Sequence, residues 1–175
     1  MTAAQTRSKA TTICQIAAMP AVYANKMVSF RAIYAGSFEG SYLVDPICRK
    51  SVWFTLPDGN ANVAVIAVHG SYPKTPERNF ELIKGEEYDK FREFAYATLE
   101  NLQPEYKVTA MFTGRIDRCK DFKVNKDGFG NGFGQMGGSE FQLVLLSISE
   151  VKAKKAEGVL RSVPSVLSDQ IPAKK

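Results

Sequence analysis

The chain has 175 residues, of which 45% are hydrophobic and 11% aromatic, so it can fold around a core of its own. No apolar run approaches the roughly 18 residues of a membrane-spanning helix. The formal net charge is +5, but residues 13–151 hold 15 basic and 16 acidic residues. The positive charge is therefore expected in the two ends of the chain, whereas nucleic-acid-binding proteins usually carry it on their folded surface.

Residues 1–12 predict a flexible N-terminal segment. They contain Arg7 and Lys9 without an apolar stretch behind them, so they do not form an intact signal peptide. The small residues of Thr2-Ala3-Ala4-Gln5 are similar to the surroundings of a cleavage site. A remnant of a removed export signal and an ordinary terminus both remain open.

A short helix is expected directly after this segment. Ile13, Ile16 and Ala17 recur at helical spacing, and Thr11 or Thr12 can cap the first turn.

Five strand-like runs follow, because apolar and polar residues alternate along them or short apolar stretches end at turn residues. They are residues 27–34 with their continuation through 41–44, then 52–56, 63–68, 107–116 and 141–151. Alternation places Val28 and Phe30 in the core. On the later strands it places Phe112 and Val144 in the core and turns Arg115 outward.

One amphipathic helix is expected near residues 86–102, between the third and fourth runs. Tyr88, Phe91 and Ala95 recur at spacings of three and four, which gives the helix one apolar stripe. Acidic residues in its first turn complement the positive end of the helix dipole.

This order of elements predicts the fold class, which is α+β and mainly β, with a five-stranded OB-like Greek-key barrel. A short N-terminal helix and the helix between strands three and four complete it. We expect the barrel domain to cover residues 13–151, with a glycine-rich loop at 128–138. Residues 152–175 are expected to form a basic, partly disordered tail.

Two stretches carry a resemblance to OB-fold proteins, residues 28–34 as a long, bent first strand and residues 113–116 at the end of the fourth. More narrowly, the chain resembles small bacterial proteins, often exported, that share a cysteine-bearing helix and three local motifs. Here these features read Ile13-Cys14, Phe38-Glu39-Gly40-Ser41, Asp45-Pro46-Ile47-Cys48 and Gly132-Phe133-Gly134. The resemblance implies the fold and a periplasmic or otherwise exported location, but no functional residue.

The three cysteines do not form a metal-binding motif. A zinc site needs about four Cys or His ligands, usually paired closely in sequence, whereas Cys14, Cys48, Cys119 and the single His69 are scattered. No metal site is expected. Either the cysteines are reduced, buried residues of a cytoplasmic protein, or Cys14 and Cys48 form a disulfide that ties the N-terminal helix to the first hairpin. In the second case their Cα atoms lie within about 7 Å, Cys119 is free, and the compartment is oxidising.

Motifs that would indicate an enzyme or a cofactor lack their required context. Residues 132–137 read Gly-x-Gly-x-x-Gly, but they precede a strand instead of joining a strand to a helix. Counted from Asn125, an EF-hand-like loop has Phe129 and Met136 where oxygen ligands belong. No nucleophile elbow is present, and a hydrolase would have to use His69 as its base. We therefore expect no cofactor and no catalytic residue.

The sequence favours a non-catalytic binding or structural module whose ligand, partner and oligomeric state it does not indicate. The alternative is a module that binds single-stranded nucleic acid or another anionic polymer, as OB-folds do with exposed aromatics beside basic residues. The candidate ligand-binding residues are Arg31, Tyr42, Trp53 and Arg115. Trp53 and Phe54 are neighbours, so one ring points out of the barrel, and a loop covering that ring is the competing interpretation.

Overall fold

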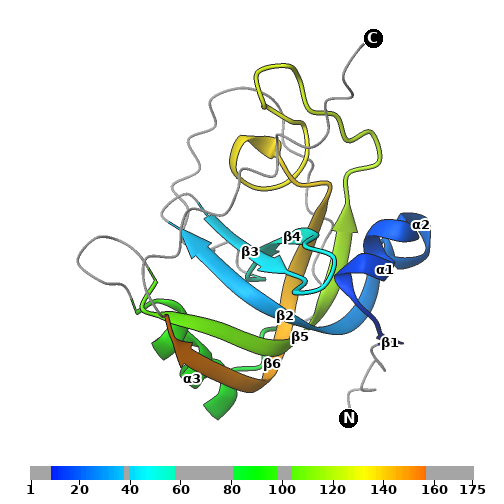
Figure 1. Ribbon diagram of the computed structural model, residues 1–175. Coiled ribbons are helices and arrows are strands. Elements are labelled where there is room, and N and C mark those ends of the chain that lie inside the picture. The colour runs from blue at the N-terminus through cyan, green and yellow to red at the C-terminus, as the bar shows by residue number, and fades with distance from the viewer. Residues whose placement is uncertain (1–8, 38–39, 58–80, 98–103, 157–175) are drawn as a thin grey trace.

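The computed structural model describes residues 9–37, 40–57, 81–97 and 104–156, which form a β-barrel with a few short helices beside it (Figure 1). The elements in chain order are β1 (Lys9–Ala10), α1 (Ile13–Ala18), α2 (Pro20–Tyr23), β2 (Lys26–Ser37), β3 (Gly40–Val44), β4 (Ser51–Thr55), α3 (Glu86–Ala95), β5 (Tyr106–Arg118), the 3-10 helix η1 (Gln135–Gly137) and β6 (Phe141–Lys155). The strand expected at 63–68 and His69 lie outside the described residues. None of the described helices is long and apolar enough to span a lipid bilayer.

Five strands close into a barrel of mixed pairing. Around the barrel, β2 is followed by β3, β4, β6 and β5, and β5 pairs again with β2. The β4–β6 pair is parallel, and the other pairs around the barrel are antiparallel. β2 permits closure because one of its edges pairs with β5 while the other pairs with β3. The prediction of a mainly β, five-stranded barrel is confirmed, but the first predicted run divides into two antiparallel strands, β2 and β3.

Apolar side chains from alternate strand positions fill the barrel. Val28, Phe30 and Phe112 are at most 1% exposed and belong to one hydrophobic cluster. Val144 is fully buried as well. The hydrophobic cluster inside the barrel, however, contains the two neighbours of Val144 in β6 and not Val144 itself. Because successive strand residues point to opposite faces, β6 is buried on both faces here, as its continuous apolar run indicates.

α3 carries an aromatic side chain into the barrel. Phe91 is 1% exposed and makes edge-to-face contacts with three core rings, at centroid distances of 5.1, 6.0 and 5.7 Å from Tyr34, Phe54 and Phe112. Such pairs contribute about 0.5–1.5 kcal/mol each beyond the burial of area. α3 ends earlier than the expected helix, whose last residues lie outside the described part of the chain.

The N-terminal part is attached to the barrel. Thr12 caps α1, and its side chain forms a capping box with Gln15, as the sequence indicates. Ile13 and Ile16 on α1 belong to the barrel cluster. β1 pairs in parallel with β2, although it lies within residues 1–12, which we expected to be flexible.

β6 continues past residue 151, where the sequence pattern places the end of the domain. Its last residues pair in register with the beginning of β5. Residues 152–155 add three lysines, so the chain from 13 to 155 has 18 basic and 16 acidic residues. Part of the positive charge expected in a tail therefore lies on the folded barrel.

Candidate functional site

Two surfaces of the barrel hold the residues that the sequence indicates for binding. The first, here named the covered face, is a row of paired residues across four strands. From β3 through β4 and β6 to β5, the row consists of Tyr42, Trp53, Gln142 and Asp117. Paired residues lie side by side on one face of a sheet, so this row shares the outer side of the barrel.

Trp53 is the ring that points out of the barrel, and it is covered. Phe54 belongs to the barrel cluster, whereas Trp53 packs with Phe133 and Cys119 in a second, smaller cluster. Trp53 is 5% exposed, and Tyr42 contacts it edge to face with 4.9 Å between ring centroids. The glycine-rich loop between β5 and β6 therefore keeps this ring from stacking on a ligand.

Glycine allows two backbone segments to approach the Trp53 ring. A Cβ on Gly40 would lie 2.1 Å from the ring, and a Cβ on Gly134 would lie 2.2 Å from it. Gly134 also has a φ of +76°, which L side chains rarely adopt. The Gly-x-Gly-x-x-Gly stretch thus serves the packing of the loop on Trp53.

Asn125 holds the far turn of the same loop. Its side-chain oxygen accepts hydrogen bonds from the backbone N–H groups of Asp127 and Phe129, as in an Asx turn. An isolated bridge between Val124 and Gly130 closes the turn. The oxygen that resembles a calcium ligand in the sequence is therefore used by the backbone.

A buried polar network lies in the covered face. The Arg115 Nε donates to Asp117 Oδ1 at 2.8 Å, and the Gln142 side-chain nitrogen donates to Asp117 Oδ2 at 3.4 Å. Arg115 is 8% exposed and Asp117 1% exposed. Arg115 lies on the outer side of β5, as alternation predicts, but it is buried there and its charge is paired with Asp117.

Cys119 is the free cysteine, and it lies at the edge of the covered face. Its thiol donates to the backbone carbonyl of Asn131 at 3.5 Å. Burial raises the pKa of the Cys119 thiol. The thiolate is the reactive form of cysteine, so burial disfavours the reactive form of Cys119.

The second surface, here named the open groove, is a shallow depression of about 380 Å³ on the outer side of β2, β5 and β6. It is lined by Arg31, Lys107, Thr109, Lys152, Ala153 and Lys154. Four of these six residues carry positive charge, and Thr109 adds a hydroxyl group. The groove is lined by the start of β5 and the end of β6, and these strand ends lie at the opposite end of the hairpin from the glycine-rich loop (Figure 1).

Two of the lysines face each other across the β5–β6 ladder. Lys107 on β5 pairs directly with Lys154 on β6, and Thr109 pairs with Lys152. Like charges at opposed positions are unfavourable in a sheet, and an anion between them would relieve that repulsion. Lys152 and Lys154 are two residues apart, so their Cα atoms are about 6.6 Å apart along β6.

Glu150 reaches Arg31 from the opposite side of the groove. The carboxylate of Glu150 on β6 forms an ion pair with the guanidinium of Arg31 on β2. In the sheet, Met111 on β5 lies between these two strands, paired with Arg31 on one side and with Ser149 on the other. The ion pair therefore spans β5.

A β-bulge in β6 contains Glu150, the partner of the groove residue Arg31. Glu150 and Val151 on β6 together oppose a single residue of β5, and Glu150 has a φ of +52°. A bulge bends its strand and re-aims a side chain. The N–H of Val151 donates to the Glu87 carboxylate of α3 at 2.6 Å, so α3 stabilises the bulge.

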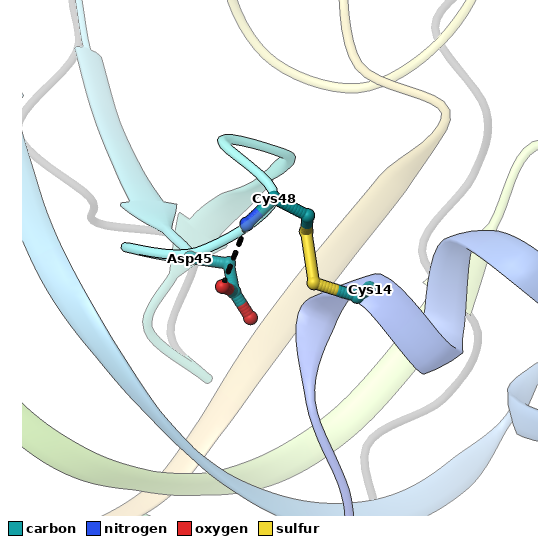
Figure 2. Close-up of side chains that lie close together, drawn as sticks. All are labelled: Cys14, Asp45 and Cys48. Carbon is teal, nitrogen blue, oxygen red and sulfur yellow. Dashed lines mark hydrogen bonds between the residues drawn. A yellow bond between two sulfur atoms is a disulfide. The ribbon is translucent and has the colours of Figure 1, made fainter.

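A disulfide joins α1 to the turn after β3 (Figure 2). The Cα atoms of Cys14 and Cys48 are 6.1 Å apart, which confirms the predicted pairing. Asp45 is 3% exposed and accepts hydrogen bonds from the backbone N–H groups of Ile47 and Cys48 at 2.8 and 3.2 Å. The two sulfurs and an Asp45 oxygen lie within 4.8 Å of one another, but sulfurs in a disulfide are not the thiolates that bind metals.

The structure separates the four predicted ligand-binding residues. Tyr42, Trp53 and Arg115 lie on the covered face, and Arg31 lies in the open groove. Sequence reasoning missed the groove lysines, Lys107, Lys152 and Lys154. The signal that could have found two of them is the period of two that continues along β6 beyond residue 151.

The chain matches no protein-family model, no curated protein and no solved structure. Its function is therefore inferred from the two surfaces and the disulfide.

Proposed function

We propose that the chain is a non-catalytic binding module with an OB-type barrel, that it acts in an oxidising compartment outside the cytoplasm, and that the open groove is its binding face. The observation that carries the proposal is the groove itself. Four cationic side chains surround a depression on the outside of a barrel whose interior is filled with its own side chains.

The strand order supports the OB type of barrel. β2, β3 and β4 are consecutive antiparallel neighbours, and β5 returns to pair with β2 on its other edge. The spatial order β5, β2, β3, β4 corresponds to a Greek key, and β6 completes a five-stranded barrel. This order also supports the relationship to the small, exported bacterial proteins that the sequence motifs resemble.

The disulfide supports the oxidising compartment. Disulfides persist in exported proteins and are rare in the cytoplasm, where thiols are kept reduced. The bridge between Cys14 and Cys48 ties α1 to the barrel, so it is part of the fold and not a peripheral link. A periplasmic or secreted location follows for a bacterial protein.

Binding fits the polar groups better than catalysis does. On the covered face, Arg115, Asp117 and Gln142 bond to one another, and the Cys119 thiol is held protonated. The open groove offers cations and a hydroxyl. Single-stranded nucleic acid, the alternative ligand, has support only through the charge of this groove, because the Trp53 ring is covered.

The test is a thermal-shift panel with three polymers, namely neutral dextran, anionic dextran sulfate and cationic poly-L-lysine. A ligand that binds the native state raises Tm by mass action. We expect at least one polymer to raise the Tm of the native chain and of a control variant, Val124→Trp, whose added ring lies in the glycine-rich loop. The groove-filling variant Thr109→Trp should lose the shift.

Two results would contradict the proposal. The first is a panel in which no polymer shifts Tm, or in which Thr109→Trp retains every shift, because the groove would then not be the binding face. The second is a polymer that is shortened after incubation, measured by size-exclusion chromatography, because the module would then be catalytic.

A further inference from the structure

Resting on the proposed function, we infer that the open groove binds a linear polyanion through charge alone. Glu150 then acts as a placeholder, which means that its carboxylate pairs with Arg31 until the ligand displaces it. The sequence indicates an anionic polymer only as an alternative ligand, and of the residues that it indicates for binding, Arg31 is the one that lines the groove. The inference rests on the charge, shape and lining of the groove and on the bulge at Glu150.

The charge of the groove selects an anion. Its lining carries four cations, Arg31, Lys107, Lys152 and Lys154, and none of its six lining residues is acidic. The cations lie on three adjacent strands, and the Glu150 carboxylate pairs with Arg31. Such a concentration of one sign attracts ions of the other sign and raises their local concentration.

The shape of the groove selects an extended ligand. The depression is shallow and open, unlike the enclosed cavities that bury most of a small molecule. Lys152 and Lys154 are spaced along β6, and Lys107 lies beside them on β5. A chain with repeated negative charges can contact these lysines in succession, whereas a single small anion can contact only part of the row.

The lining of the groove indicates recognition without base stacking. None of its six lining residues is aromatic, and proteins that hold single strands by their bases use aromatic side chains for stacking. Lysine acts as a point charge and does not impose the planar geometry of a bidentate contact. The ligand is therefore recognised by its phosphate or sulfate groups and not by its other parts.

Glu150 has the properties of a placeholder. Its positive φ is a strained conformation for a residue other than glycine, and the hydrogen bond from Val151 to Glu87 holds the bulge that imposes it. The Arg31 and Glu150 side chains are 40% and 56% exposed. An exposed ion pair contributes little free energy, so a polyanion can replace the Glu150 carboxylate at Arg31.

The experiment measures the affinity of the full chain for fluorescent long-chain polyphosphate by anisotropy, between 50 and 200 mM salt. With four contacts and a slope of about −0.7 per contact, affinity should fall about 50-fold over this range. Lys107→Gln with Lys154→Gln should reduce the fall to about sevenfold. The control, Lys120→Gln with Lys126→Gln, removes the same charge from the connection between β5 and β6 and should keep the native slope.

A second variant is expected to bind polyphosphate more tightly, a result that a misfolded variant would not give. In Glu150→Gln the ligand reaches Arg31 without breaking an ion pair, so the affinity for polyphosphate at 50 mM salt should rise by about two- to fivefold, the range that an exposed ion pair can contribute. Unchanged or weaker binding by Glu150→Gln would overturn the placeholder role. Equal salt slopes for the groove variant and its loop control would overturn the site.

Parallel titrations with oligo(dT) and dextran sulfate of matched charge test which anionic groups of the ligand the groove recognises. Affinities within about tenfold of polyphosphate support recognition by charge alone, whereas much tighter binding of oligo(dT) would overturn it in favour of base recognition. If no polyanion depends on the groove but another polymer of the thermal-shift panel does, this inference fails and the proposed function stands. If no polymer depends on the groove, both fail.

Discussion

The covered face and the open groove lie on the outer side of the same barrel, and β5 contributes to both. Arg115 and Lys107 are both on its outer side, at opposite ends of the strand. Arg115 is buried in a hydrogen-bonded network, whereas Lys107 is exposed beside two more lysines. The difference shows that a residue pointing away from a barrel is available to a ligand only where no other part of the chain covers it.

The two surfaces also use different chemistry. The covered face satisfies its own groups, since Trp53 is packed by a loop and Asp117 pairs with Arg115. The open groove instead places Lys107 directly opposite Lys154, an unfavourable arrangement within a sheet. The covered face should therefore contribute stability with little binding, and the groove should contribute binding with little stability.

Trp53→Ala should give the largest effect on the covered face. Loss of this buried ring leaves a cavity, so the free energy of unfolding should fall by about 3–5 kcal/mol in urea denaturation. The affinity for polyphosphate should stay within about twofold, because distant sites act independently. Phe112→Ala in the barrel core is the control and should lose a similar amount. A loss below about 1 kcal/mol for Trp53→Ala would show that the loop does not pack on this ring.

Removal of the disulfide should give the next largest effect. The bridge joins residues separated by 34 positions, and for a loop of that length Cys14→Ser with Cys48→Ser should lower stability by about 2–4 kcal/mol. Binding in the groove should be unchanged. A thiol reductant should destabilise the native chain by a similar amount and leave the double variant unaffected.

Thiol counting tests the same bridge without mutation. Denatured, unreduced protein from its native compartment should have one free thiol, that of Cys119. Three free thiols would remove the bridge and with it the main support for an exported location.

Gly134→Ala should have a smaller effect, of about 1–3 kcal/mol in urea denaturation. The new Cβ would meet the Trp53 ring at 2.2 Å, at a φ of +76°, and such backbone strain is costly for a residue other than glycine. The control is Gly85→Ala before α3, where an added Cβ meets no atom within 4 Å and should cost less than about 1 kcal/mol. Equal effects of the two variants would contradict the packing of the loop on Trp53.

Lys107→Gln should have the smallest effect on stability and the opposite sign. Removing one of two opposed lysines should leave the free energy of unfolding unchanged or raise it by about 0.2–0.5 kcal/mol. The same change should weaken the binding of polyphosphate at low salt. Lys120→Gln is the matched control for charge. A clear loss of stability on Lys107→Gln would show that this lysine stabilises the fold. It would contradict the expectation that the groove contributes little stability.

The local chemistry of the chain determined much of the fold. Alternating apolar residues specify β2 and β5, and the Tyr88, Phe91 and Ala95 stripe specifies α3, because one face of each must be buried. Thr12 and the apolar residues behind it specify α1. The Cys14–Cys48 pair could be named as well, since the two cysteines lie in segments that meet when the first hairpin forms.

Tertiary structure alone decided which outward residues are exposed. Alternation tells on which side of a strand Trp53, Arg115 and Lys107 lie. Tertiary packing decides that the first two are buried, Trp53 against Phe133 of the glycine-rich loop and Arg115 beside Asp117. The end of β6 was likewise set by pairing with β5, which extends the strand through lysines that locally resemble a charged tail. Periodicity is a property of neighbouring residues, whereas exposure and strand ends depend on segments distant in sequence, so the proposed binding surface forms only when the chain is folded.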